Sequence, residues 1–276
     1  MNAIAPAARL PRLEAKGQVA FRGVLVSEWT KLRSVRSTKW SLAVGFLLTI
    51  AFPIIFAFAT SSHWGTMSPQ DRAGRHPLEI ALAGVNVAQL AIAVLGVLLI
   101  SAEYSTGSIR STFTAVPRRL PVLWAKVIDY AIVSFVLTVP AVVISFFATQ
   151  AILARHDILQ ISFTHSGVTR SVFGGALYVM LVGIFALGLG AIVRNTAGGI
   201  ATFAGIFFVL PPLMNVLPLS WNNAISQYLP LEAGSQLFTL HHGAHTLTPL
   251  AGGLVLAAYC AAAIAIAAVL LVRRDV

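Results

Sequence analysis

The residues that could do chemistry in this sequence lie in short polar segments between long apolar runs. Glu28 and Lys31 stand three residues apart in the segment Ser27–Ser34, SEWTKLRS, and Glu103 opens the segment Glu103–Arg110, EYSTGSIR. Carboxylates and basic side chains of this kind make charge-assisted contacts, either within a chain or with a partner. They do not form a paired set of catalytic residues, so we expect contact rather than catalysis.

The common catalytic and nucleotide-binding patterns are missing from the sequence. It contains no GxxxxGK[ST] phosphate loop, so the chain should not hydrolyse ATP by itself. It also contains no HExxH and no GxSxG pattern. His241 and His245 could share a metal on a helix, but no acid or cysteine accompanies them locally. We therefore expect no catalytic residue, no cofactor and no metal site, and we interpret the histidines as part of a polar loop.

The composition indicates that the bilayer is the solvent of most of this chain. Hydrophobic residues make up 57% of it and charged residues only 10%, against about a quarter in soluble domains. A helix needs about 20 apolar residues to cross the hydrocarbon core. The apolar runs are continuous rather than alternating, which favours helices over a β-barrel. The sequence predicts an all-α membrane protein with six spanning helices, at about Trp40–Thr60, Ile80–Ser101, Val122–Ile152, Val172–Val193, Ala197–Leu217 and Pro249–Val272.

The basic residues predict the orientation of these helices. With both termini in the cytosol, 15 of the 19 lysines and arginines lie on the cytosolic side, as the positive-inside rule requires. The net charge of +10 is therefore a topology signal at the ends of spans, and we expect no nucleic acid partner. We predict a multi-pass protein of the plasma (inner) membrane. It should have a flexible cytosolic N-terminus (1–18), a connecting helix (19–39) and a six-helix membrane domain (40–276).

The segment before the first span has the pattern of a basic amphipathic helix lying in the membrane interface. Trp29 would suit the headgroup level and the basic residues would suit anionic lipid. Glu28 falls inside the apolar arc, and we expect it to pair with Lys31 or to contact another helix. At about 100° per residue the apolar arc covers about 140° and consists of Phe21, Val24, Leu25, Trp29, Leu32 and Val35.

The loop between the second and third spans predicts a short helix parallel to the membrane. Ile109, Phe113 and Val116 recur at helical spacing and Pro117 stops the run. Ser105 or Thr106 could cap its start. By itself this pattern could also describe a turn that rests on lipid.

Few polar side chains occur inside the spans. Asp129 is the one candidate for a proton relay, and Lys126, one turn earlier, offers it a partner. Asn86 and Gln89 could face a transport pathway or bridge two helices. Five glycines make one face of the fourth span small and suited to close packing, and the prolines imply kinks in their helices; these residues are Gly174, Gly175, Gly183, Gly188, Gly190, Pro53, Pro140, Pro211 and Pro212.

The order of these segments resembles the permease subunits of type-2 ABC transporters, especially the small bacterial six-helix ones. The resemblance covers the whole chain in layout. Its specific part is SEWTKLRS before the first span, then EYSTGSIRST and VPRR after the second, with Ser108 where threonine is frequent. It implies that the pre-span segment is a connecting helix and that the loop after the second span is a coupling helix that docks on a separate ATPase subunit. The coupling contact would include Glu103, Tyr104, Gly107, Ile109 and Arg110, with Glu28, Trp29 and Lys31 of the connecting helix nearby.

The resemblance also implies partners and an activity. An ABC ATPase subunit would supply the energy, and a second permease subunit, in a homodimer or a heterodimer, would complete the pathway within membrane lipid. We expect export of an amphipathic, drug-like or lipid-like substrate. The alternative is a polytopic membrane protein that transports nothing and serves as an anchor, an assembly factor or the partner of a sensor.

Overall fold

The computed structural model describes residues 20–116, 118–158, 160–240, 243 and 245–273, and every regular element in these ranges is a helix. Six helical segments of the described chain are long and apolar enough to cross a membrane, as predicted. The predicted N-terminal segment, residues 1–18, lies outside the described residues. The chain therefore has the build of a multi-pass membrane protein. The six segments are α2 (Arg36–His63), α4 (Pro77–Ser105), α6 (Arg119–Arg155), α7 (Val168–Val193), the continuous run α8 (Thr196–Ala204), η2 (Gly205–Val209) and α9 (Leu210–Met214), and α12 (Pro249–Arg273).

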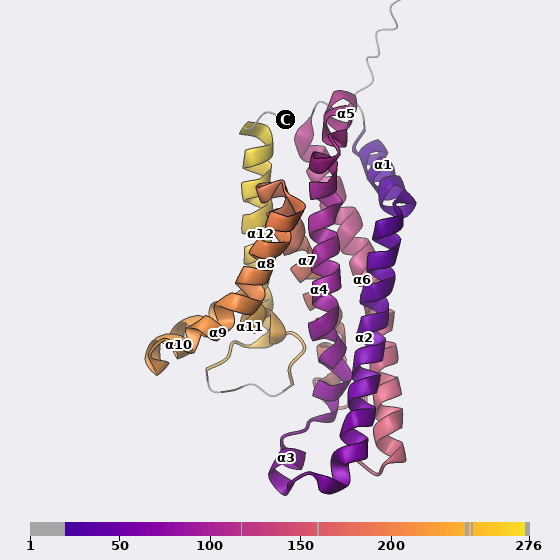
Figure 1. Cartoon of the computed structure of the whole chain (residues 1–276), viewed down its shortest axis with the longest axis vertical. Helices are drawn as coiled ribbons and strands as arrows, with labels where there is room; N and C mark the ends of the chain where they lie inside the picture. The colour runs from indigo at the N-terminus through magenta and orange to yellow at the C-terminus, as the bar shows by residue number, and fades with distance from the viewer. Residues whose placement is uncertain (1–19, 117, 159, 241–242, 244, 274–276) are drawn as a thin grey trace, which may run out of the picture.

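Helices α4 and α7 form the centre of the bundle, with α2, α6 and α12 packed around them (Figure 1). Small residues allow this close packing. A Cβ atom on Gly96 of α4 would lie 2.4 Å from the carbonyl oxygen of Gly183 on α7, and one on Gly84 would lie 2.3 Å from that of Thr49 on α2. The glycines of the fourth span, α7, pack closely as predicted: a Cβ atom on Gly190 would lie 2.9 Å from the carbonyl oxygen of Val97, and one on Gly188 would lie 2.8 Å from the Cβ of Ala263.

The fifth span has an irregular middle. Residues Gly205–Val209 form a π-helical turn, in which the N–H of Leu210 bonds to the carbonyl of Gly205. Pro211 and Pro212 follow at once, and neither has an N–H for the regular α-helical pattern. A π turn is one of the recognised ways in which a helix absorbs such a break. From there α9 and α10 (Leu219–Ile225) lead away from the bundle (Figure 1).

Several short helices complete the fold, and their bounds are η1 (Trp64–Thr66), α3 (Pro69–Ala73), η3 (Ser226–Tyr228) and α11 (Pro230–Ser235). Two more, α1 (Phe21–Ser34) and α5 (Ser108–Ala115), lie at the end of the bundle where α12 finishes (Figure 1). This end, which we call the α1–α5 end, holds the candidate site.

The predicted connecting helix over residues 19–39 is shorter in the structure. Helix α1 ends at Ser34 because Val35 is extended, with φ −74° and ψ 122°, and residues from Arg36 onward belong to α2. Val24 and Leu32 of the predicted apolar arc are buried together with Glu28, at i, i+4 and i+8 on one face. Phe21 and Val35 of the same arc are exposed on the surface of the chain. Helix α1 thus packs on α6 through a face with a carboxylate at its centre.

Candidate functional site

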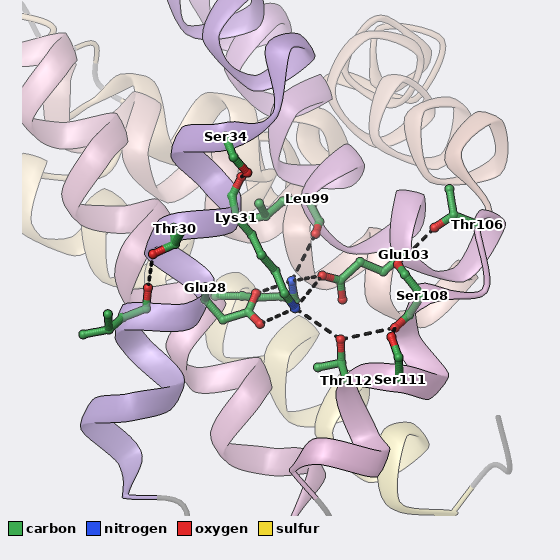
Figure 2. Close-up of polar contacts among 12 residues, drawn as sticks. Glu28, Thr30, Lys31, Ser34, Leu99, Glu103, Thr106, Ser108, Ser111 and Thr112 are labelled. Carbon is green, nitrogen blue, oxygen red and sulfur yellow. Dashed lines mark hydrogen bonds and ion pairs between the residues drawn. The ribbon is translucent and has the colours of Figure 1, made fainter.

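Four charged side chains meet at the α1–α5 end, and we call them the four-charge cluster: Glu28, Lys31 and Glu103, which Figure 2 labels, and Lys126. The Nζ of Lys126 on α6 lies 2.6 Å from Oε2 of Glu28 on α1 and 2.8 Å from Oε1 of Glu103 on α4. The Nζ of Lys31 on α1 lies 2.7 Å from Oε1 of Glu28 and 3.2 Å from Oε1 of Glu103. Two carboxylates and two ammonium groups therefore neutralise each other across three helices.

Three of the four side chains in the cluster are largely buried, so their charges need partners within the protein. The side chains of Lys126 and Glu28 are 2% and 4% exposed, and that of Glu103 is 14% exposed. An isolated buried charge costs several kcal/mol, whereas a paired one is offset by its partner. A separation of Lys126 from both carboxylates would leave its buried ammonium group without a partner and leave the two carboxylates to share Lys31. The cluster therefore holds α1, α4 and α6 in one arrangement.

Lys31 extends the cluster to α5. Its Nζ donates to Oγ1 of Thr112 at 3.2 Å, and Thr112 in turn donates to the carbonyl of Ser108 (Figure 2). Partial burial of Lys31 lowers its pKa, but the hydrogen bond and charge of Glu28, together with Glu103, outweigh this, so its pKa is raised above the ordinary lysine value. The ammonium form of Lys31 is therefore the form that the folded protein favours.

Two arginines tie the same end of the bundle to α12. The guanidinium of Arg194 lies 5.0 Å from the centre of the Tyr104 ring and donates to the carbonyl of Leu270 at 3.0 Å. The guanidinium of Arg119 lies 5.4 Å from the centre of the Phe113 ring and donates to the carbonyl of Leu271 at 2.9 Å. These carbonyls belong to the last turn of α12, where positive charge is favourable.

Helix α5 presents a hydroxyl-rich face to the outside. Thr106, Ser108 and Ser111 are exposed, as is Gly107 at the start of the helix. Gly107 has φ +70°, and no atom lies within 4 Å of the position where a Cβ would stand. Glycine adopts this left-handed conformation without the strain that other residues incur. The turn into α5 is therefore sharp, open and built on a glycine.

Ile109, which the resemblance assigns to the coupling contact, has a side chain that is buried within the chain, 3% exposed. Ile109 and Phe113 stand one turn apart, and the amphipathic α5 turns this apolar side inward. Ile109 therefore fastens α5 to the bundle. The side chain of Arg110 lies outside what the structure describes.

Two predictions about polar residues in the spans have different outcomes. The pairing of Lys126 with Asp129 is wrong: Lys126 turns to the two glutamates, and Oδ2 of Asp129 is buried without a hydrogen-bond partner in the described chain. Gln89 bridges two helices, because its Oε1 accepts a hydrogen bond from the Tyr178 hydroxyl of α7. Asn86 is exposed and lines a pocket of about 270 Å³.

Sequence reasoning found Glu28, Lys31 and Glu103 but missed that Lys126 joins them. A signal was present, since Glu28 and Lys126 are opposite charges that each interrupt an apolar face.

In the described ranges no group of three or more histidine, cysteine or acidic residues could hold a metal ion, and His241 lies outside those ranges. No family model matches the chain, and the search of curated proteins also found no match.

Proposed function

We propose that this chain is the permease subunit of an ATP-binding cassette transporter, an exporter of amphipathic, drug-like or lipid-like substrates driven by a separate ATPase subunit. The α1–α5 end would face the cytosol, with both termini there, in the plasma (inner) membrane. A second permease subunit would complete the pathway. The observation that carries the proposal is the attachment of α5: a short helix outside the spans is hydrogen-bonded through Thr112 to Lys31, which belongs to a charge cluster that joins α1, α4 and α6.

This attachment suits the transmission of force. A partner that pushes on α5 would act through Thr112 on Lys31, and through the four-charge cluster on α4 and α6. The arginine contacts would carry the same displacement to α12. Rigid-body rocking of membrane helices is the usual result of such a push in transporters. The lack of a phosphate loop in the sequence fits a division of labour between this chain and an ATPase.

The structure changes which residues we expect to meet the ATPase. The exposed tip, Thr106, Gly107, Ser108 and Ser111, becomes the proposed contact, with Glu103 and Tyr104 as supports behind it. Ile109 becomes an anchor of α5, so a charge at Ile109 would disturb folding as well as docking. A test of the contact must therefore use an exposed position.

The test compares Ser111→Trp with Ser166→Trp, after affinity purification of the tagged chain from its native host. Both serines are exposed, and Ser166 lies in the turn between α6 and α7, at the opposite end of the bundle. The wild type and Ser166→Trp should co-purify an ATPase with a phosphate loop and support ATP hydrolysis in proteoliposomes. Ser111→Trp should lose most of both, while its melting temperature stays unchanged.

The alternative, a membrane protein that transports nothing, makes the opposite forecast. A passive anchor needs no ATPase, so its purified complex would hydrolyse no ATP above the background of empty liposomes. The tryptophan at position 111 would then change neither the partners nor any activity. Either result would remove the support for a permease.

A further inference from the structure

A groove of about 700 Å³ lies outside the four-charge cluster and is lined by residues of α1, α2 and α6. The ribbons of these three helices lie together at this end of the bundle (Figure 1). The groove opens beside the extended residue Val35, at which the chain passes from α1 to α2. Its volume falls within the usual range for small-molecule sites. Its floor is apolar and is formed largely by Leu42, Ile132, Val133, Val136 and Leu137.

The rim of the groove is cationic. Arg33 and Lys39 line it, both are exposed, and neither forms an ion pair in the described part of the chain. Thr30 and Ser34 also line the groove, and none of the described residues that line it is acidic. An anion with acceptor oxygens is therefore the complementary ligand for the rim.

The position of the groove along the membrane normal adds a second requirement. Lys39 is the last charged residue before the apolar run of α2, and the wall from Ile132 to Leu137 belongs to the spanning helix α6. Trp29, a residue type that favours the headgroup level, also lines the groove. A ligand that fills the groove must be anionic at the rim and apolar below it.

We propose that this groove binds one anionic phospholipid from the adjoining leaflet, with its phosphate between Arg33 and Lys39 and an acyl chain along Ile132 to Leu137. Basic residues near a membrane surface attract anionic lipid, and the apolar wall gives the chain a protein surface to follow. The bound lipid would cover the junction between α1 and α2. The inference needs only a membrane-embedded bundle and does not rest on the assignment to a transporter.

The test is native mass spectrometry of the full chain in detergent, titrated with phosphatidylglycerol or with phosphatidylcholine of the same acyl chains. We expect one phosphatidylglycerol adduct that forms at least roughly tenfold more tightly than the phosphatidylcholine adduct. Each basic residue is worth roughly fivefold in affinity, so Arg33→Gln/Lys39→Gln should weaken phosphatidylglycerol binding roughly 30-fold. Val133→Trp, which fills the wall, should reduce the adducts of both lipids.

The matched control is Arg22→Gln/Arg36→Gln, which removes the same charge from the same end of the bundle without touching the groove. This control should retain phosphatidylglycerol binding within about twofold, and all variants should keep the melting temperature of the wild type. An equal loss of phosphatidylglycerol binding in the control would show that the lipid is attracted to basic residues in general, and it would overturn the proposal of a specific site. Competition by glycerol 3-phosphate, which has no acyl chain, would overturn it as well. A stable dimer that Val133→Trp dissociates, with no lipid adduct, would assign the groove to a second copy and reject the lipid.

Discussion

Replacement of Lys126 by methionine tests whether the four-charge cluster stabilises the fold. Methionine keeps much of the length of the side chain but removes the ammonium group that lies 2.6 Å from Glu28 and 2.8 Å from Glu103. The two carboxylates are then left with Lys31, whose side chain is 39% exposed. Loss of one partner from a buried charge pair costs about 3–5 kcal/mol, and we expect Lys126→Met to fall in this range.

The assay is denaturant unfolding in detergent micelles, followed by tryptophan fluorescence. Lys39→Met is the matched control, because Lys39 is exposed and should change the free energy of unfolding by no more than about 0.5 kcal/mol. The double variant Glu28→Gln/Lys126→Met should recover part of the loss, since it removes one of the stranded carboxylates. A coupling of about 0.5–3 kcal/mol is expected for groups in direct contact. If Lys126→Met is no less stable than Lys39→Met, the cluster does not hold the helices together.

Two further predictions concern the connection from the cluster to α5. Gly107→Ala should destabilise the protein by about 1–2 kcal/mol, measured as a lower melting temperature, because φ at this position is +70° while space for the methyl group is free. Lys31 has a raised pKa, so its contribution to stability is complete below its unfolded pKa of about 10.5 and is lost as the pH rises through the folded value. The melting temperature of the wild type should therefore fall more between pH 9 and pH 11.5 than that of Lys31→Met. Equal falls would contradict the pairing of Lys31 with the glutamates.

The spanning helices were predictable because the bilayer demands about 20 apolar residues in succession and the sequence provides six such runs. The end of α1 was not predictable in the same way. Val35 continues the apolar pattern of the preceding turn, and nothing local to it marks the extended conformation that separates α1 from α2. Helix α1 packs on α6 through Val24, Glu28 and Leu32, and this contact between distant segments is not visible in the local sequence.

In the candidate site, too, contacts between residues close in the sequence were predictable and contacts between residues far apart were not. The pair Glu28–Lys31 follows from helical spacing, and the structure confirms it. The contact between Glu28 and Lys126 joins residues 98 positions apart, which a single sequence does not reveal. Periodicity also predicted that Ile109 and Phe113 lie on one face of a short helix. It did not predict whether that face contacts the rest of the chain or points outward. The apolar side turns toward the bundle because buried apolar surface is available there.

The neutrality of the cluster limits which motions the chain can use if it is a permease. Any displacement that pulled α4 away from α1 and α6 would separate Glu103 from both Lys31 and Lys126 and leave a largely buried carboxylate without a partner, at a cost of several kcal/mol. A movement of α1, α4, α5 and α6 as one body keeps every ion pair and avoids this cost. The fifth span has weaker constraints, because its middle is a π turn and it is largely exposed. We therefore expect relative motion between the helices that the ion pairs join, α1, α4 and α6, and the fifth span, rather than within the α1–α5 end.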